Sequence, residues 1–322
     1  MSTTDLPTFD DVLRAADRIA PHAHRTPVLT SHLVDERAGA QVFFKCENFQ
    51  RVGAFKFRGA CNAVMSLTDE EAERGVATHS SGNHAAALAL AARLRGIRAY
   101  VVMPTSAPAP KRAAVLDYGA CVVDCAPTLA ARESTVAQVI EQTGATLVHP
   151  FDDVRVIAGQ GTAALELLDE VPDLDVVVAP IGGGGLFSGT AIAVRGRSGT
   201  TRTIAAEPEA ADDAHRSIRE QRLLPSNDPI TIADGLRTSL APRTFAALRA
   251  HGGEVVTVSE AAIVEAMRFV WERMKIIIEP SSAVPVAVVL GRRFAKPDKA
   301  RIGILVSGGN VDLDRLPWSP PA

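Results

Sequence analysis

The chain has 322 residues, of which 47% are hydrophobic and 22% charged, and its formal net charge is −3. This length suffices to bury a large core, and the balanced charge argues against a nucleic-acid partner. Residues 1–11 lack the pattern of a signal peptide and no apolar run reaches the roughly 20 residues that span a bilayer, so we expect a cytoplasmic, soluble protein without a membrane partner.

Short apolar segments alternate with alanine- and leucine-rich helical segments along the chain. This alternation is typical of an α/β protein with parallel sheets. Strands are predicted at residues 76–78, 99–103, 121–124, 176–179, 203–206, 255–258 and 301–306, and helices at 84–94, 109–118 and 161–168. The strand–helix units form two sets, which predicts a large domain of residues 1–74 and 151–322 and a small mobile domain of residues 75–150.

Three of the predicted strands end in glycine-rich or small polar segments. Residues 79–84 follow the first strand, the glycine run 182–185 follows the strand at 176–179, and Ser307 with two glycines follows the last. Ligands of open α/β sheets bind at the carboxyl ends of the strands. We therefore expect these three segments to converge on one site.

The four consecutive glycines precede an alanine-rich helical segment. Loop amides and the positive end of a helix hold a phosphate without an arginine, whereas one or two glycines suffice for an ordinary strand–helix turn. A dinucleotide is the alternative ligand, because Gly183, Gly185 and Gly189 are spaced as in such sites and Glu207 follows at the end of the next strand. That alternative leaves Lys56 and Ser307 without a role.

Lys56 has apolar or glycine neighbours in the segment 53–60. Such surroundings desolvate an amine and lower its pKa, which suits a Schiff-base lysine that also acts as a general base. Residues 80–84, Ser-Ser-Gly-Asn-His, come directly before a strong helix-forming segment. They are either a simple helix cap or, as we favour, a receptor for a substrate carboxylate.

Six segments, in order along nearly the whole chain, resemble the serine racemase and threonine/serine dehydratase family: residues 53–60, 79–84, 156–162, 182–185, 232–235 and 307–310. Members of this family are fold-type II pyridoxal phosphate (PLP) enzymes, similar in architecture to the tryptophan synthase β subunit. The resemblance implies two lobes, each a mostly parallel sheet flanked by helices, a PLP cofactor and a homodimer.

The resemblance also implies roles for individual residues. Lys56 would bind PLP covalently and act as the base on one face of the substrate Cα, and Ser81 lies where racemases of the family have the base of the opposite face. The cofactor contacts would come from Phe55 beside the ring, Asn83 at the 3-hydroxyl, Ser307 at the ring nitrogen, and Gly182, Gly183, Gly184, Gly185 and Leu186 at the phosphate. The substrate carboxylate would be bound by Ser80, Ser81, Asn83, His84 and, on lobe closure, Arg132.

By the same resemblance, a divalent cation would lie near Glu207, the Ala211 carbonyl and Asp213. Oxygen ligands of this kind suit Mg²⁺, with Ca²⁺ or Mn²⁺ as alternatives. The other interpretation of this segment is an ordinary acidic loop.

The identity of residue 307 bears on the reaction. A serine hydroxyl does not hold the ring nitrogen charged as an aspartate would, so we expect a weaker electron sink and prompt loss of a β-hydroxyl. We therefore predict a dehydratase that converts L-serine, L-threonine or 3-hydroxyaspartate to a 2-oxo acid and ammonia. Serine racemisation by Lys56 and Ser81 is the close alternative, alone or beside elimination, and a non-catalytic PLP- or nucleotide-binding protein is the distant one. Phe151 favours the dehydratases, whereas Ala54 is similar to fungal and plant racemases.

Overall fold

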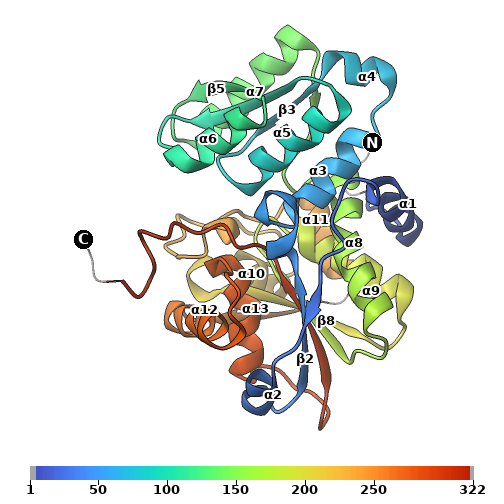
Figure 1. Ribbon diagram of the computed structural model, residues 1–322, viewed down its shortest axis with the longest axis vertical. Coiled ribbons are helices and arrows are strands. Elements are labelled where there is room, and N and C mark those ends of the chain that lie inside the picture. The colour runs from blue at the N-terminus through green and yellow to red at the C-terminus, as the bar shows by residue number, and fades with distance from the viewer. Residues whose placement is uncertain (1–4, 252, 320–322) are drawn as a thin grey trace.

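The computed structural model describes residues 5–251 and 253–319. The first four residues of the polar N-terminal segment lie outside this range. Figure 1 shows an upper lobe built on one sheet and a larger lower lobe built on another. Within the described residues the upper sheet has four strands, all parallel, and the lower has six, of which only β1 is antiparallel to its neighbour.

The lower sheet has the strand order β1 (Val28–Leu29), β2 (Gln41–Cys46), β10 (Arg301–Val306), β7 (Val176–Pro180), β8 (Arg202–Pro208) and β9 (Glu254–Val258). The upper sheet has the order β5 (Cys121–Cys125), β4 (Ala99–Pro104), β3 (Val76–His79) and β6 (Thr146–Leu147). All seven predicted strands are confirmed to within two residues. Strand β2, which is the neighbour of β10, and the two-residue strands β1 and β6 were not predicted.

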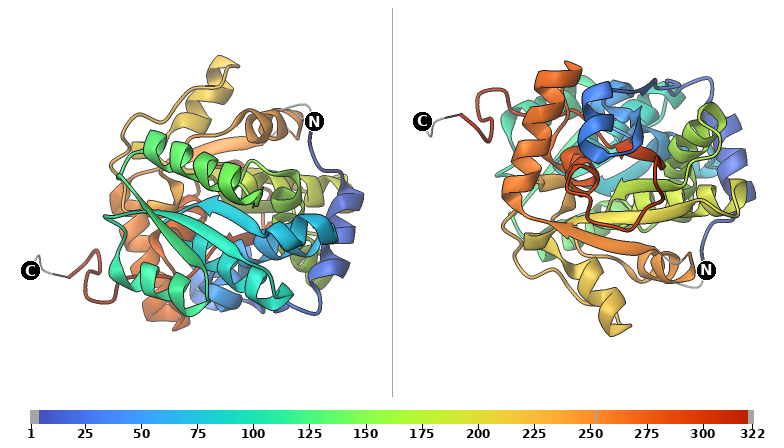
Figure 2. Two further views of the ribbon diagram at one scale, coloured as in Figure 1. Left: turned by 90° about the horizontal axis from the view of Figure 1, so that it is seen from above. Right: turned by 90° about the horizontal axis from the view of Figure 1, so that it is seen from below.

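The helices of the upper lobe are α4 (Asp69–Arg74), α5 (Asn83–Arg95), α6 (Ala109–Asp117) and α7 (Leu129–Thr143). Neighbouring residues of its strands point to opposite faces. Val76, Val101 and Met103 pack on the side of α5, while Ala77 and Val102 pack against Val136 and Val139 of α7. Helices thus cover both faces of this sheet, as the view from above shows (Figure 2).

The remaining helices are α1 (Phe9–Ile19), α2 (His32–Ala38), α3 (Lys56–Met65), α8 (Val154–Glu170), α9 (Gly185–Arg197), α10 (Asp213–Glu220), α11 (Pro242–Ala250), α12 (Glu260–Met274) and α13 (Pro280–Leu290). Helices α2, α12 and α13 bury one face of the lower sheet, and α8, α9 and α11 bury the other. The short turns η1 (Glu47–Phe49), η2 (Arg51–Gly53), η3 (Glu209–Ala211) and η4 (Asp234–Leu236) connect these elements.

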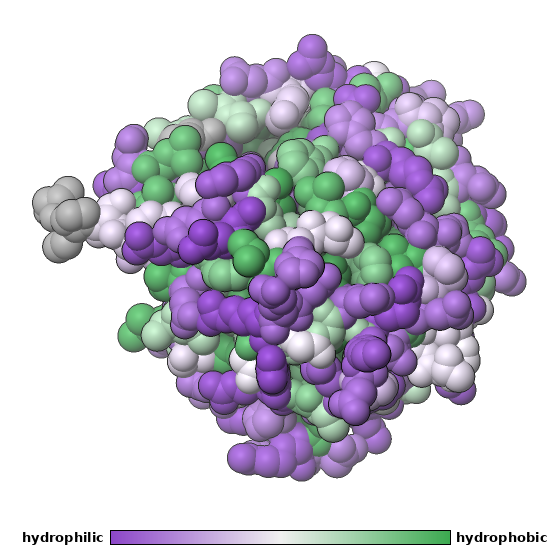
Figure 3. All heavy atoms as spheres, turned by 60° about the horizontal axis from the view of Figure 1, so that its bottom comes forward, coloured by the Kyte–Doolittle hydropathy of each residue, from purple (hydrophilic) through white to green (hydrophobic). Residues whose placement is uncertain are grey.

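Figure 3 shows the molecule with the bottom of Figure 1 turned forward, where hydrophilic residues predominate and hydrophobic areas lie between them. None of the helices in residues 5–251 and 253–319 is long and apolar enough to cross a membrane.

Candidate active site

The loop before Lys56 is held directly against the end of β10. The Phe55 N–H donates to the Ser307 carbonyl at 2.9 Å, and the Gly309 N–H donates to the Gly53 carbonyl at 2.9 Å. Ala54 and Gly308 form an antiparallel bridge between these two contacts. Two motifs about 250 residues apart in sequence therefore form one backbone unit, with Lys56 at the start of α3.

The Lys56 side chain is half-buried and its Nζ donates to the Pro150 carbonyl at 2.9 Å. Nζ also lies 5.1 Å from the centroid of the Phe55 ring. Desolvation by burial lowers the pKa of this amine to about 8, although the nearby Glu279 carboxyl opposes the shift. The lowered pKa that the apolar neighbours of Lys56 predicted is confirmed.

The glycine run forms a tight bend between β7 and α9. Gly184 has φ +87°, and a Cβ at Gly183 would lie 2.4 Å from the Phe151 ring. A Cβ at Gly182 would lie 2.8 Å from the Leu236 backbone. Close packing therefore requires glycine at these positions whatever is bound there. Phe151 follows Pro150, the hydrogen-bond partner of Lys56, so the amine and the bend are neighbours.

Glu279 is a buried carboxylate that the sequence did not single out. It accepts from the Asn83 amide at 3.1 Å, and Asn83 in turn accepts from the Asn310 amide at 2.9 Å. Burial, together with the Asp234 charge, raises the pKa of Glu279 to about 7. Glu279 thus fixes Asn83, the residue that the resemblance places at the cofactor 3-hydroxyl. The pattern Glu-Pro before an apolar helix marks a helix start, but only the fold brings Glu279 to Asn83.

The predicted carboxylate receptor forms the turn between β3 and α5. Ser80 Oγ accepts from the Gly82 N–H at 3.3 Å. The half-buried Ser81 hydroxyl bonds to no other residue of the described chain. The first amides of α5 point out of the helix without intrahelical partners, which leaves them available to an anion.

His84 presents no charge to this turn. Its buried ring donates Nε2–H to the Val148 carbonyl at 3.1 Å, and desolvation lowers its pKa to about 3. The imidazole is therefore neutral, and only the main-chain N–H of His84 remains suited to a carboxylate. His79 and His149, whose rings lie 5.6 Å apart, also have lowered pKa values because of burial.

Two cations of the upper lobe lie near this site. Lys111 of α6 forms an ion pair with Asp234 of the lower lobe at 2.8 Å. Arg132 of α7 has a buried Nε without a hydrogen-bond partner in the described residues. Burial lowers the pKa of His79, and the positive charge of Arg132 is the next cause of this shift. Arg132 therefore lies near His79, at the end of β3.

Glu207 and Asp213, the predicted metal ligands, are fully buried. Glu207 accepts the N–H groups of Ala214 and His215, both at 2.9 Å, and Asp213 accepts that of Leu240 at 2.9 Å. One Asp213 oxygen has no partner in the described residues. Burial raises the pKa of Asp213 to about 6. Burial and, after it, the charge of Asp213 raise the pKa of Glu207 well above its ordinary value.

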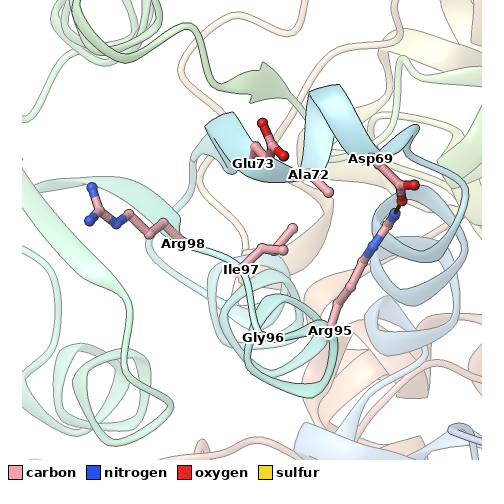
Figure 4. Close-up of a pocket in the computed structure, with 7 residues that line it drawn as sticks. All are labelled: Asp69, Ala72, Glu73, Arg95, Gly96, Ile97 and Arg98. Carbon is pink, nitrogen blue, oxygen red and sulfur yellow. Dashed lines mark ion pairs between the residues drawn. The ribbon is translucent and has the colours of Figure 1, made fainter.

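A separate hollow of about 430 Å³ lies on the upper lobe between α4 and the end of α5 (Figure 4). Arg95, which lines it, donates to the carbonyls of Val64 and Leu67 and lies 3.9 Å from Asp69. The guanidinium of Arg95 is thus bonded within the protein. None of the predicted site residues lines this hollow.

The family model for pyridoxal-phosphate dependent enzymes matches residues 19–308. The chain belongs to this family. It is 52% identical over 314 residues to a beta-hydroxyaspartate dehydratase of Paracoccus denitrificans, covering 98% of this chain and 99% of that one. It is 46% identical over 311 residues to the L-threo-3-hydroxyaspartate ammonia-lyase of Saccharomyces cerevisiae, covering 96% and 95%.

Among solved structures, the serine racemase of Dictyostelium discoideum superimposes with a TM-score of 0.92 at 48% identity, covering 97% of this chain and 100% of that chain. The predicted fold-type II architecture and PLP cofactor are therefore confirmed. The prediction that the chain is a PLP-dependent enzyme of the ammonia-lyase and racemase kind is also confirmed.

Proposed function

We propose that the chain is a PLP-dependent dehydratase that eliminates the β-hydroxyl of 3-hydroxyaspartate, L-serine or L-threonine, giving a 2-oxo acid and ammonia. The observation that carries the proposal is the Lys56 amine, which is desolvated, has a pKa of about 8, and lies beside both the glycine bend and the Ser307 segment. The similarity to two relatives named for hydroxyaspartate favours that substrate.

The residues present fit PLP. Lys56 would hold its aldehyde carbon, Asn83 its 3-hydroxyl, and Ser307 its ring nitrogen, with Phe55 beside the ring. The amides of Gly182, Gly183, Gly184, Gly185 and Leu186 would bind the phosphate at the start of α9, where the helix dipole favours an anion. When bound, PLP supplies an electron sink for the bonds to Cα.

The chain's own residues would carry the proton steps. A lysine with a pKa of about 8 has a substantial neutral fraction near neutral pH, so Lys56 is suited to remove the Cα proton. The α-carboxylate would be bound by the amides and hydroxyls of Ser80, Ser81, Asn83 and His84, with Arg132 completing the site on closure. We propose that residues 75–150 move as a small domain in this closure, relative to residues 1–74 and 151–322.

Serine racemisation is the second candidate function. It is supported by the partner-free hydroxyl of Ser81 and by the similarity to a serine racemase. In this alternative Ser81 returns a proton to the face of Cα opposite Lys56. Both reactions begin with the same proton removal, so a single site is suited to both.

We further propose that Glu207, the Ala211 carbonyl and Asp213 bind a divalent cation, Mg²⁺ first. Two buried carboxylates that make no ion pair in the part of the chain that the structure describes, one with an unpartnered oxygen, support this site. Oxygen donors suit Mg²⁺ or Ca²⁺. The cytoplasmic location and the homodimer stay predictions.

The test is incubation of the PLP-loaded protein with L-threo-3-hydroxyaspartate, L-serine and L-threonine. We expect 2-oxo acid and ammonia from at least one of them. Lys56→Ala should lose both product formation and the visible absorbance of bound PLP. D-Serine is measured in parallel. Ser81→Ala should remove D-serine formation and lower elimination much less, because the other groups that bind the carboxylate remain. Formation of D-serine without any 2-oxo acid would reject the dehydratase in favour of the racemase.

A further inference from the structure

One residue of the upper lobe holds the proposed carboxylate receptor at both of its ends. The receptor turn joins β3 to α5, and Val148 lies beside each of these elements. The Val148 N–H donates to the Ala77 carbonyl of β3 at 2.9 Å, and the Val148 carbonyl accepts from the His84 ring at 3.1 Å. Val148 is fully buried, and His84, the second residue of α5, is 2% exposed. The backbone before the turn and the helix after it are thus tied to the same residue.

The His84 ring makes its contact as a neutral donor. A carbonyl oxygen carries no proton, so Nε2 must carry one, and Nδ1 of the neutral ring then has only a lone pair. Nδ1 is buried and has no partner in the described residues. Burial and, after it, the charge of Lys56 lower the pKa of the ring to about 3. A buried polar atom without a partner costs free energy, so the ring is a poor choice for filling space alone, and its value lies in the Nε2–H contact.

The turn carries the groups that would bind the substrate carboxylate. The first amides of α5 lack intrahelical partners, and the Ser81 hydroxyl bonds to no other residue of the described chain. The start of the turn is held separately, because the Ser80 N–H donates to the Val102 carbonyl at 3.1 Å. We infer that the His84 side chain is a positioning residue, which fixes the first turn of α5 so that its amides and the Ser81 hydroxyl face the α-carboxylate. This inference rests on the proposed function, in which the turn binds that group, and it gives the ring a role that needs no charge.

The same contact connects the receptor to the proposed base. Pro150, two residues after Val148, accepts from Lys56 Nζ at 2.9 Å. A continuous path therefore runs from α5 through the His84 ring and residues 148–150 to Lys56. Loss of the ring contact should let the receptor shift relative to Lys56, rather than only loosen the upper lobe.

The experiment measures the affinity of the PLP-loaded protein for glycine, which has the α-carboxylate and amino group of the substrate but no β-hydroxyl to lose. Binding is followed by the change in the visible absorbance of the cofactor, so no turnover is needed. His84→Leu removes the donor at similar volume and should raise the glycine Kd about tenfold, the effect of losing one buried hydrogen bond. His84→Gln keeps an N–H donor without a charge and should bind glycine nearly as the wild type does.

Leu88→Ala is the matched control. Leu88 lies one turn later on α5, is fully buried in the core of the upper lobe and is not part of the receptor turn. Its truncation leaves a cavity and should lower the Tm while the glycine Kd stays at the wild-type value. The control thereby separates a shift of the receptor from a general loss of stability.

A glycine Kd that rises no more in His84→Leu than in Leu88→Ala overturns the inference. Binding by His84→Gln that is as weak as in His84→Leu also overturns it, because the donor would then not be what matters. If the wild type shows no response to glycine, the carboxylate receptor is wrongly assigned and the inference fails with it. If glycine binds as expected but no substrate yields a 2-oxo acid, the proposed dehydratase fails and the inference stands.

Discussion

Two buried charge clusters of the lower lobe differ in whether they are complete. Arg58 pairs with Glu47 at 2.7 Å and with Glu166 at 2.7 Å, and Lys45 pairs with Glu166 at 2.6 Å, so two cations meet two carboxylates. Glu207 and Asp213 instead form a pair of buried carboxylates that make no ion pair within the described residues. The first cluster is neutralised by ion pairs within the chain, whereas Glu207 and Asp213 accept only backbone N–H groups within the described residues.

Lys56 resembles the second cluster, because its amine is desolvated and bonds to a carbonyl rather than to a carboxylate. Arg58, two residues later on the same helix, is fully buried and bound by two carboxylates. Perturbed and unpaired ionisable groups are typical of functional sites. The comparison therefore distinguishes charges that are paired within the fold from charges that are not, and mutations test this distinction.

The largest expected effect follows from breaking the complete cluster. Arg58→Met leaves Glu47 buried without its cation, and loss of one partner of a buried pair costs about 3–5 kcal/mol. Denaturant unfolding of the cofactor-free protein measures this loss. The control is Arg112→Ala, which removes a solvent-accessible ion pair with Asp124 and should change the free energy of unfolding little, because water and salt screen such pairs. Equal losses in the two variants would show that the cluster has no special role in the fold.

The incomplete cluster should respond to metal. Saturating Mg²⁺ at about 100 times its Kd should stabilise the protein by about 2.7 kcal/mol, seen as a higher Tm that a chelator reverses. Asp213→Asn removes one of two repelling carboxylates and should be more stable without metal but no longer respond to Mg²⁺. Glu209→Gln, an exposed acid of the same loop, should keep the response. A Tm that neither Mg²⁺ nor chelation changes would remove the cation site.

The free energy of unfolding should depend on pH through the titration of Lys56, whose amine has no carboxylate partner in an ion pair within the described residues. Its pKa of about 8 in the folded protein lies below the ordinary lysine value of 10.5, so folding releases a proton between these two pH values. The cofactor-free wild type should therefore gain stability as pH rises from about 8 to 10.5, relative to Lys56→Met. Below pH 8 the Lys56→Met variant should be the more stable, by about 1 kcal/mol after discounting for partial solvation. Parallel pH profiles of the two proteins would contradict a desolvated amine.

The sequence predicts the strands because each is an apolar run bounded by turn residues. Strand β2 was not predicted because the charged Lys45 interrupts its apolar run, and Glu166, which forms an ion pair with Lys45, is distant in sequence. The site motifs were likewise visible as local patterns, whereas Glu279 matters only through its contact with Asn83, which the fold creates. Periodicity and composition carry information about neighbours in sequence, so partners brought together by tertiary packing stay invisible to them.

The smallest effect is expected for the ion pair between the lobes. Lys111 and Asp234 are 34% and 47% exposed, so water competes for both charges and the pair should contribute about 1 kcal/mol or less. A double-mutant cycle of Lys111→Ala and Asp234→Ala isolates this coupling. Because the pair joins α6 to η4, the same variants should increase hydrogen exchange in the segment 80–84 even though global stability hardly changes. A coupling as large as the loss in Arg58→Met would place this pair with the charges that hold the fold, and the distinction between the two kinds of charge would then not follow burial.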